Sequence, residues 1–244
     1  MSVVGTIVKR ELGAYFTSPV AYVFLVIFLL LTGFFTFTSG NFFERGEASL
    51  GAFFSWHPWL FLLVVPAIGM RLWSEERRSG TLELLFTLPI ATWQAIVAKF
   101  LASWIFIAVA LALTFPMVIT VNVLGDPDNG AIVAGYLGSF LLAGAYLAIT
   151  CMTSAMTRNQ VVALIVAVVI CLFLVLAGFS PVTELMVRWA SSALVDTVAA
   201  FSVVTHFDGF MRGVIDTRDL FFFLSVIGFS LFATGVILRG HRAG

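Results

Sequence analysis

The chain has 244 residues, of which 61% are hydrophobic and 11% are charged, and its formal net charge is zero. A water-soluble domain of this size carries roughly a quarter of its residues as charged side chains. The low charge content and the mean hydropathy of +1.07 exclude an ordinary soluble domain. They indicate that a lipid bilayer is the solvent of most of the chain.

The first turns of the chain have an amphipathic pattern. Apolar residues recur at helical spacing from Val3 to Phe16, and Ser2, Thr6, Lys9 and Arg10 lie on the opposite face. This pattern predicts a helix in the cytoplasmic interface of the membrane, ended by Thr17-Ser18-Pro19. The alternative is an extension of the first membrane span, which the charges of Lys9, Arg10 and Glu11 disfavour.

Six stretches without Asp, Glu, Lys or Arg are at least about 18 residues long, the length that indicates a membrane-spanning helix. They are Leu12–Phe43, Ala48–Met70, Phe100–Gly125, Asn129–Thr157, Asn159–Thr183 and Leu220–Leu238. Lipid requires each span to satisfy its own backbone hydrogen bonds. The sequence therefore predicts an all-α integral membrane protein with six transmembrane helices in a single domain, residues 1–244.

The basic residues predict the orientation of these spans. With six spans both termini lie on one side, and nine of the 13 Lys and Arg residues then fall on that side. Cytoplasmic loops carry the excess of positive charge, so we expect both termini in the cytoplasm. The late start and the length of the first span argue against a cleavable signal peptide.

Two further groups of residues are expected to have structural roles. Cys151 and Cys171 fall inside predicted spans, where a disulfide is improbable and a packing role is the default. His57 and His206 are expected near the external interface, and with His241 they are too scattered for a metal site.

The region between the fifth and sixth spans, Pro181 to Asp219, is expected outside the membrane. Its apolar residues, including Leu185 and Val195, predict one or two short helices that lie on the membrane surface or on partner helices. Span four carries small residues, among them Gly138 and Gly144, which allow another helix to approach closely.

The charges of the chain are concentrated between the second and third spans, from Arg71 to Pro89. Glu75-Glu76-Arg77-Arg78 is predicted to be a solvated cluster, followed by Gly80, which breaks the helix. Thr81 begins another short helix with Glu83 near its start, where the helix dipole favours negative charge. Its leucines, Leu84, Leu85 and Leu88, are too apolar for open water, and Pro89 ends it. The segment is either a docking element for a cytosolic partner or an ordinary loop resting on the membrane, and its spacing alone favours neither.

The pattern from Glu75 through Leu85, with Pro89 following, resembles the signature of ABC-2 type transporter permeases, in its usual place between spans two and three. The six spans, the interfacial N-terminal helix and the external re-entrant region resemble that family along essentially the whole chain. His206-Phe207-Asp208-Gly209-Phe210 and the following Arg212–Asp219 resemble its gliding-motility-type branch.

The resemblance implies a cytoplasmic coupling helix at Gly80–Pro89, seated in a groove of an ATPase subunit. The residues expected to mediate ATPase coupling are Glu75, Glu76, Arg77, Arg78, Gly80, Thr81, Glu83, Leu84, Leu85, Leu88 and Pro89. The implied partners are two cytosolic ATPase subunits, a second permease copy, membrane lipids and an extracytoplasmic auxiliary protein, with no nucleic acid. The implied location is a bacterial-type inner membrane.

The sequence lacks the phosphate loop G-x-x-x-x-G-K-[ST], so we expect no ATP hydrolysis and no cofactor in this chain, with ATP and magnesium bound by the partner. The predicted spans carry no charge at mid-depth, which disfavours an ion-coupled carrier. A protease motif E-E-x-x-x-R is excluded because position 80 is Gly80. The expected function is the permease subunit of an ATP-driven exporter; the alternatives are a non-transporting membrane scaffold or an ion-coupled transporter.

Overall fold

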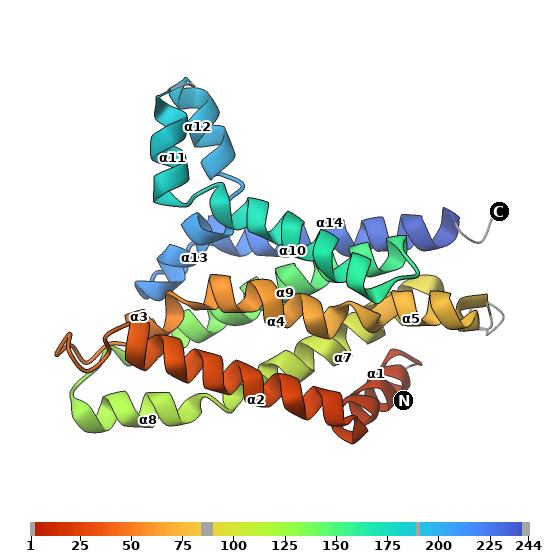
Figure 1. Ribbon diagram of the computed structural model, residues 1–244, viewed down its shortest axis with the longest axis horizontal. Coiled ribbons are helices and arrows are strands. Elements are labelled where there is room, and N and C mark those ends of the chain that lie inside the picture. The colour runs from red at the N-terminus through yellow and green to blue at the C-terminus, as the bar shows by residue number, and fades with distance from the viewer. Residues whose placement is uncertain (1–2, 84–89, 189–190, 241–244) are drawn as a thin grey trace.

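The computed structural model describes residues 3–83, 90–188 and 191–240 of the chain. Over these residues the secondary structure is helical, with no strand. Most of the helices run along one long axis, and both chain ends lie at the same end of the bundle (Figure 1). We name this the terminal end and the opposite one the distal end.

In chain order the helices are α1 (Val3–Thr17), α2 (Pro19–Phe34), the π-helix η1 (Phe35–Ser39), α3 (Gly51–Phe54), α4 (His57–Gly69), α5 (Arg71–Ser79), α7 (Thr92–Ala112), α8 (Phe115–Leu124), α9 (Asn129–Met156), α10 (Gln160–Leu176), α11 (Ser180–Val187), α12 (Ser192–Ala199), α13 (Val203–Met211) and α14 (Thr217–Gly240). The described chain passes back and forth along the bundle, with α5 continuing the direction of α4 and α8 that of α7 (Figure 1).

Four helical stretches of the described chain are long and apolar enough to cross a membrane. They are Pro19–Ser39, Thr92–Leu124, Asn129–Met156 and Thr217–Gly240. Two bent helix pairs raise the number to six if each is one span: α10 with α11, bent by 65°, and the pair formed by Ala193–Ala199 and α13, bent by 66°. The prediction of an all-α protein with several membrane-spanning helices is confirmed, and the described residues give at most six spans.

The second predicted span, Ala48–Met70, does not form one long helix. The apolar run is divided into α3, of four residues, and α4, of 13 residues, and the chain turns again at Met70 before α5. Pro58 in the first turn of α4 has no N–H to continue a preceding helix. In Figure 1, α4 and α5 nevertheless follow one another along the bundle.

Helix α9 is the centre of the molecule, and 78% of its most apolar 18-residue stretch is buried. It packs against α4, α5, α7, α10, α13 and α14. A Cβ added at Gly138 would lie 2.6 Å from the Cβ of Phe210, and one at Gly144 would lie 2.8 Å from the indole of Trp104. The prediction that small residues on this helix allow close approach is confirmed.

The N-terminal helix is separate from the first span, as predicted. α1 ends at Thr17, and Pro19 stands in the first turn of α2, where a missing N–H costs nothing. α1 has no fully buried residue and packs chiefly against α7. Tyr15 connects the two helices through a hydrogen bond between its hydroxyl and that of Ser103, at 2.8 Å.

Three short helices follow α10, where one or two were predicted. α10 ends at Leu176, before the predicted end of the fifth span at Thr183, and Pro181 stands in the first turn of α11. In Figure 1, α11 and α12 project sideways from the distal part of the bundle, and α13 returns to it. α13 then packs on α9 and α14.

His57, which was predicted near the external interface, is fully buried inside the protein. Its Nδ1 lies 2.7 Å from the Ser139 hydroxyl, and its ring stacks on Phe61 with centroids 5.0 Å apart. His206 is also buried, with Nδ1 2.6 Å from a carboxylate oxygen of Asp219. These contacts give both histidines structural roles, His57 between α4 and α9 and His206 between α13 and α14.

Candidate functional site

The charged segment predicted as a docking element begins with α5 at the terminal end of the bundle. Its start is fixed to the central helix by one serine. The Ser154 hydroxyl oxygen accepts hydrogen bonds from the N–H groups of Trp73 and Ser74, both at 3.0 Å, and donates one to the Met70 carbonyl at 2.8 Å. Backbone groups at a helix start and at a turn lack helical partners. Ser154 supplies these partners, so α5 is attached to α9 at its first turn.

The indole of Trp73 is the apolar anchor of α5. It is fully buried, and its N–H lies 3.2 Å from the Cys151 sulfur on α9. The ammonium group of Lys99 lies 5.3 Å from the centre of the ring, a distance at which a cation is attracted to an aromatic face. Trp73 therefore joins α5 to α9 and also to α7, which carries Lys99.

Lys99 is the centre of a charge cluster that joins three helices. Its side chain is 7% exposed, and its ammonium nitrogen lies 2.8 Å from a carboxylate oxygen of Glu76 on α5 and 3.8 Å from one of Glu11 on α1. Taking such charges out of water is costly, and attraction and hydrogen bonds to partners offset that cost. Glu76, 21% exposed, thereby links α5 to α7, and Lys99 in turn links α7 to α1.

Arg77 is bonded to the end of α9. Its guanidinium donates a hydrogen bond to the Ala155 carbonyl at 2.6 Å. Partial burial and then the neighbouring Arg158 cation lower the pKa of Arg77 from its ordinary value. The prediction of a solvated cluster therefore holds only in part for Glu76 and Arg77, because both are partly buried and have partners within the chain.

Other polar residues of the segment do face solvent. Glu75 and Arg78 are exposed on α5, and Thr81 and Glu83 are exposed beyond it. Gly80 ends α5 with φ of 73°, in the left-handed region where glycine has no steric penalty. An added Cβ there would meet no atom within 4 Å, so the backbone conformation, rather than space, favours glycine. Gly80 ends the helix as predicted.

A second helical segment begins after Gly80, as far as the structure describes it. Thr81, Leu82 and Glu83 are helical, and Leu82 is buried. The hydroxyl groups of Ser79 and Thr81 are hydrogen-bonded at 2.8 Å, which connects the two sides of the turn. The rest of the predicted coupling helix, with Leu84, Leu85, Leu88 and Pro89, lies outside the described residues.

The sequence analysis missed the residues that hold α5 in place. Lys99 was counted for orientation, although its position as a lone cation at the start of an apolar run was a signal for a buried partner. Ser154 and Cys151 gave no signal, because short polar side chains in a membrane helix commonly bond their own backbone. Their partners lie about 80 residues earlier in the chain.

A family model described as "ABC-2 family transporter protein" matches residues 5–187 of the chain. The matched region starts in α1, includes the whole of the α5 segment and ends with α11. No curated protein matches the chain.

Proposed function

The chain belongs to the ABC-2 transporter family, a family of non-catalytic membrane permease subunits, and from this premise we propose that it couples ATP hydrolysis by a separate ATPase to export. In this proposal the ATPase holds ATP and magnesium and docks on the exposed residues around Gly80. The observation that supports the proposal best is the fixed position of α5. Its inner face is bonded to α9 and α7, and to α1 indirectly through Lys99, while Thr81 and Glu83 beyond its tip are exposed to solvent.

The contacts of α5 suggest how a push on its tip would travel. A force on Gly80 reaches α9 through Ser154 and Arg77. It reaches α7 and α1 through the Lys99 cluster. Closure of the ATPase would thus move the central helix and two of its neighbours together, because packed helices shift as units. Glu76 and Arg77 would transmit the motion, and Glu75, Arg78, Thr81 and Glu83 would contact the ATPase.

The finer expectations belong to the same proposal. We expect two ATPase subunits, a second permease copy, an extracytoplasmic auxiliary protein and a lipid-like or amphipathic substrate, in a bacterial-type inner membrane with both termini in the cytoplasm. The gliding-motility-type branch stays a prediction. The family match ends at residue 187, before the stretch from His206 to Asp219 on which that narrower resemblance depends.

Glu83→Lys tests the docking. We expect the variant to lower permease-stimulated ATP turnover at least about tenfold, since like charge opposite a docking surface costs several kcal/mol. The measurement is ATP turnover by the P-loop ATPase that co-purifies with the chain from its native membrane. Asp126→Lys is the matched control, because Asp126 is an exposed acid on the connection between α8 and α9, at the distal end.

Turnover that is unchanged by Glu83→Lys would contradict the proposal. A chain that purifies without any ATPase and tolerates Glu83→Lys would support the scaffold alternative. Transport driven by an ion gradient without ATP would support a carrier instead.

A further inference from the structure

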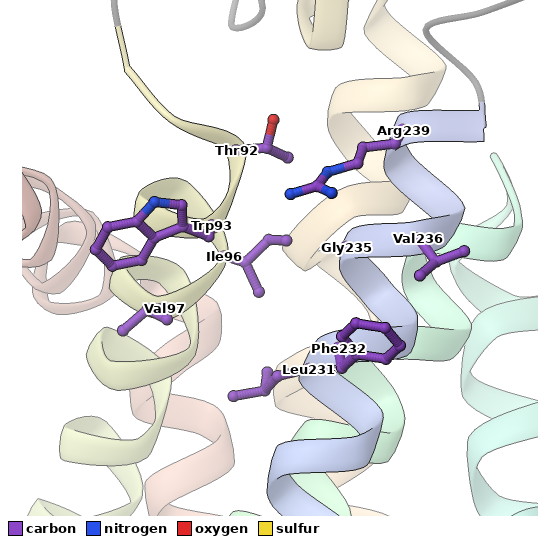
Figure 2. A pocket seen from close by; sticks show the side chains of 9 residues that line it. All are labelled: Thr92, Trp93, Ile96, Val97, Leu231, Phe232, Gly235, Val236 and Arg239. Carbon is purple, nitrogen blue, oxygen red and sulfur yellow. The ribbon is translucent and has the colours of Figure 1, made fainter.

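An apolar groove lies between α7 and α14, beside the first turns of α7. It has a volume of about 230 Å³. Its walls are formed by Ile96 and Val97 of α7 and by Leu231, Phe232 and Val236 of α14. Figure 2 shows these side chains on the two facing helices.

The floor of the groove is open because residue 235 has no side chain. A Cβ added at Gly235 would lie 3.6 Å from the terminal methyl of Ile96, an ordinary contact. A longer side chain at this position would therefore extend into the groove without disturbing the two helices. Gly235 is accordingly the position at which the groove can be filled deliberately.

The mouth of the groove is polar and lies at the terminal end. Arg239 and Thr92 line it, and Figure 2 shows the Arg239 guanidinium directed across the groove toward the α7 side. Arg239 is exposed, and among the described residues no carboxylate lies within ion-pair distance of it. Within the part of the chain that the structure describes, the groove thus offers one cation without an acidic partner, above an apolar channel.

The position of Arg239 along its helix corresponds to the depth of lipid headgroups. α14 has 24 residues, or about 36 Å at 1.5 Å per residue, and the hydrocarbon core of a bilayer is about 30 Å thick. Arg239 is the second-to-last residue of this helix. Trp93 is 56% exposed, and tryptophan is enriched at the depth of the lipid headgroups.

We propose that this groove is a binding site for an anionic phospholipid, with one acyl chain between α7 and α14 and the phosphate at Arg239 and Thr92. Arg239 supplies the charge complementarity, since a guanidinium binds phosphate oxygens in a bidentate manner. The Thr92 hydroxyl adds a further donor. Basic pockets between membrane helices recognise lipid headgroups in this way. The proposal depends on the membrane location of the chain and not on ATPase coupling.

The test uses the full chain purified in detergent and native mass spectrometry. Dioleoyl phosphatidylglycerol is titrated against dioleoyl phosphatidylcholine, which has the same acyl chains and no net charge. We expect one phosphatidylglycerol to bind at least about tenfold more tightly than phosphatidylcholine. Arg239→Gln should abolish that preference, and Gly235→Leu should weaken the binding of both lipids.

Matched controls lie on the same helix. Arg218→Gln removes an exposed cation at the other end of α14, and Gly228→Leu adds a side chain where no atom lies within 4 Å. Both should bind phosphatidylglycerol like the unsubstituted chain. Equal losses in Arg239→Gln and Arg218→Gln would indicate unspecific charge attraction and overturn the proposal.

Two other results would also overturn it. Glycerol phosphate that competes as well as the lipid would show an anion site without an acyl-chain site. If the variant Val236→Cys forms a disulfide with a second copy in native membranes, protein rather than lipid covers the groove.

Discussion

Lys99→Met is expected to lower the free energy of unfolding by about 3 kcal/mol. Removing one partner of a buried ion pair typically costs about 3–5 kcal/mol, because the other charge is left without compensation. Glu76 would lose its contact at 2.8 Å, and its second carboxylate oxygen is buried and has no hydrogen-bond partner among the described residues. The lower end of the range applies because Glu76 is 21% exposed and keeps some contact with water. Denaturant unfolding of the purified chain in detergent measures the effect.

The double variant Lys99→Met with Glu76→Leu separates the ion pair from the packing. Replacing both partners of a buried pair by apolar side chains is often nearly neutral, so we expect it to recover most of the lost stability. Lys9→Met is the matched control, since Lys9 is exposed on α1, and it should change stability by less than about 0.5 kcal/mol. The account of the cluster fails if Lys99→Met is as stable as Lys9→Met. It also fails if the stability lost in the double variant equals the sum of the losses in the single variants Lys99→Met and Glu76→Leu.

Gly138→Val is expected to have an effect of similar size, about 3 kcal/mol, at the distal end. The new Cβ would lie 2.6 Å from the Cβ and 2.7 Å from the Cγ of Phe210. Rotation of the phenyl ring cannot relieve this clash, because the Cβ of Phe210 is fixed to the backbone of α13. Phe210 is fully buried, so α13 would have to move away from α9, and overpacking of this kind costs about 1–3 kcal/mol. The same unfolding measurement applies.

Gly228→Val provides the comparison for this substitution. Gly228 lies in the middle of α14, and an added Cβ would meet nothing within 4 Å. Valine has a somewhat higher helix propensity than glycine, so the variant should be neutral or slightly more stable. Equal destabilisation by the two substitutions would mean that helix propensity, and not the contact with Phe210, accounts for the loss.

Uninterrupted apolar runs predicted the long helices well. The runs at Asn129–Thr157 and Leu220–Leu238 correspond closely to α9 and α14. A count of apolar residues responds to composition, however, and not to turns. It therefore joined α3 and α4 into one span, and it placed the start of the third span at Phe100, although α7 begins at Thr92.

The structure of the charged segment was predicted only in part, because composition reports local chemistry and not the packing of distant helices. Its composition indicated where it lies and where Gly80 breaks the helix, because both depend on local chemistry. Which charges turn inward depends on the faces of other helices. Lys99 meets Glu76 and Glu11 through packing that brings α1, α5 and α7 together. The spacing of residues along the sequence does not show which distant helices will be in contact.

The most direct test of the central claim, that a cytosolic ATPase docks on the tip of α5, is the maleimide labelling rate of Glu83→Cys. The native Cys151 and Cys171 are fully buried, so a soluble maleimide should report on the new thiol in detergent solution. We predict rapid labelling of the chain alone and at least about tenfold slower labelling with the ATPase bound, while Asp126→Cys reacts equally in both. A rate at position 83 that is the same with and without bound ATPase would contradict the account.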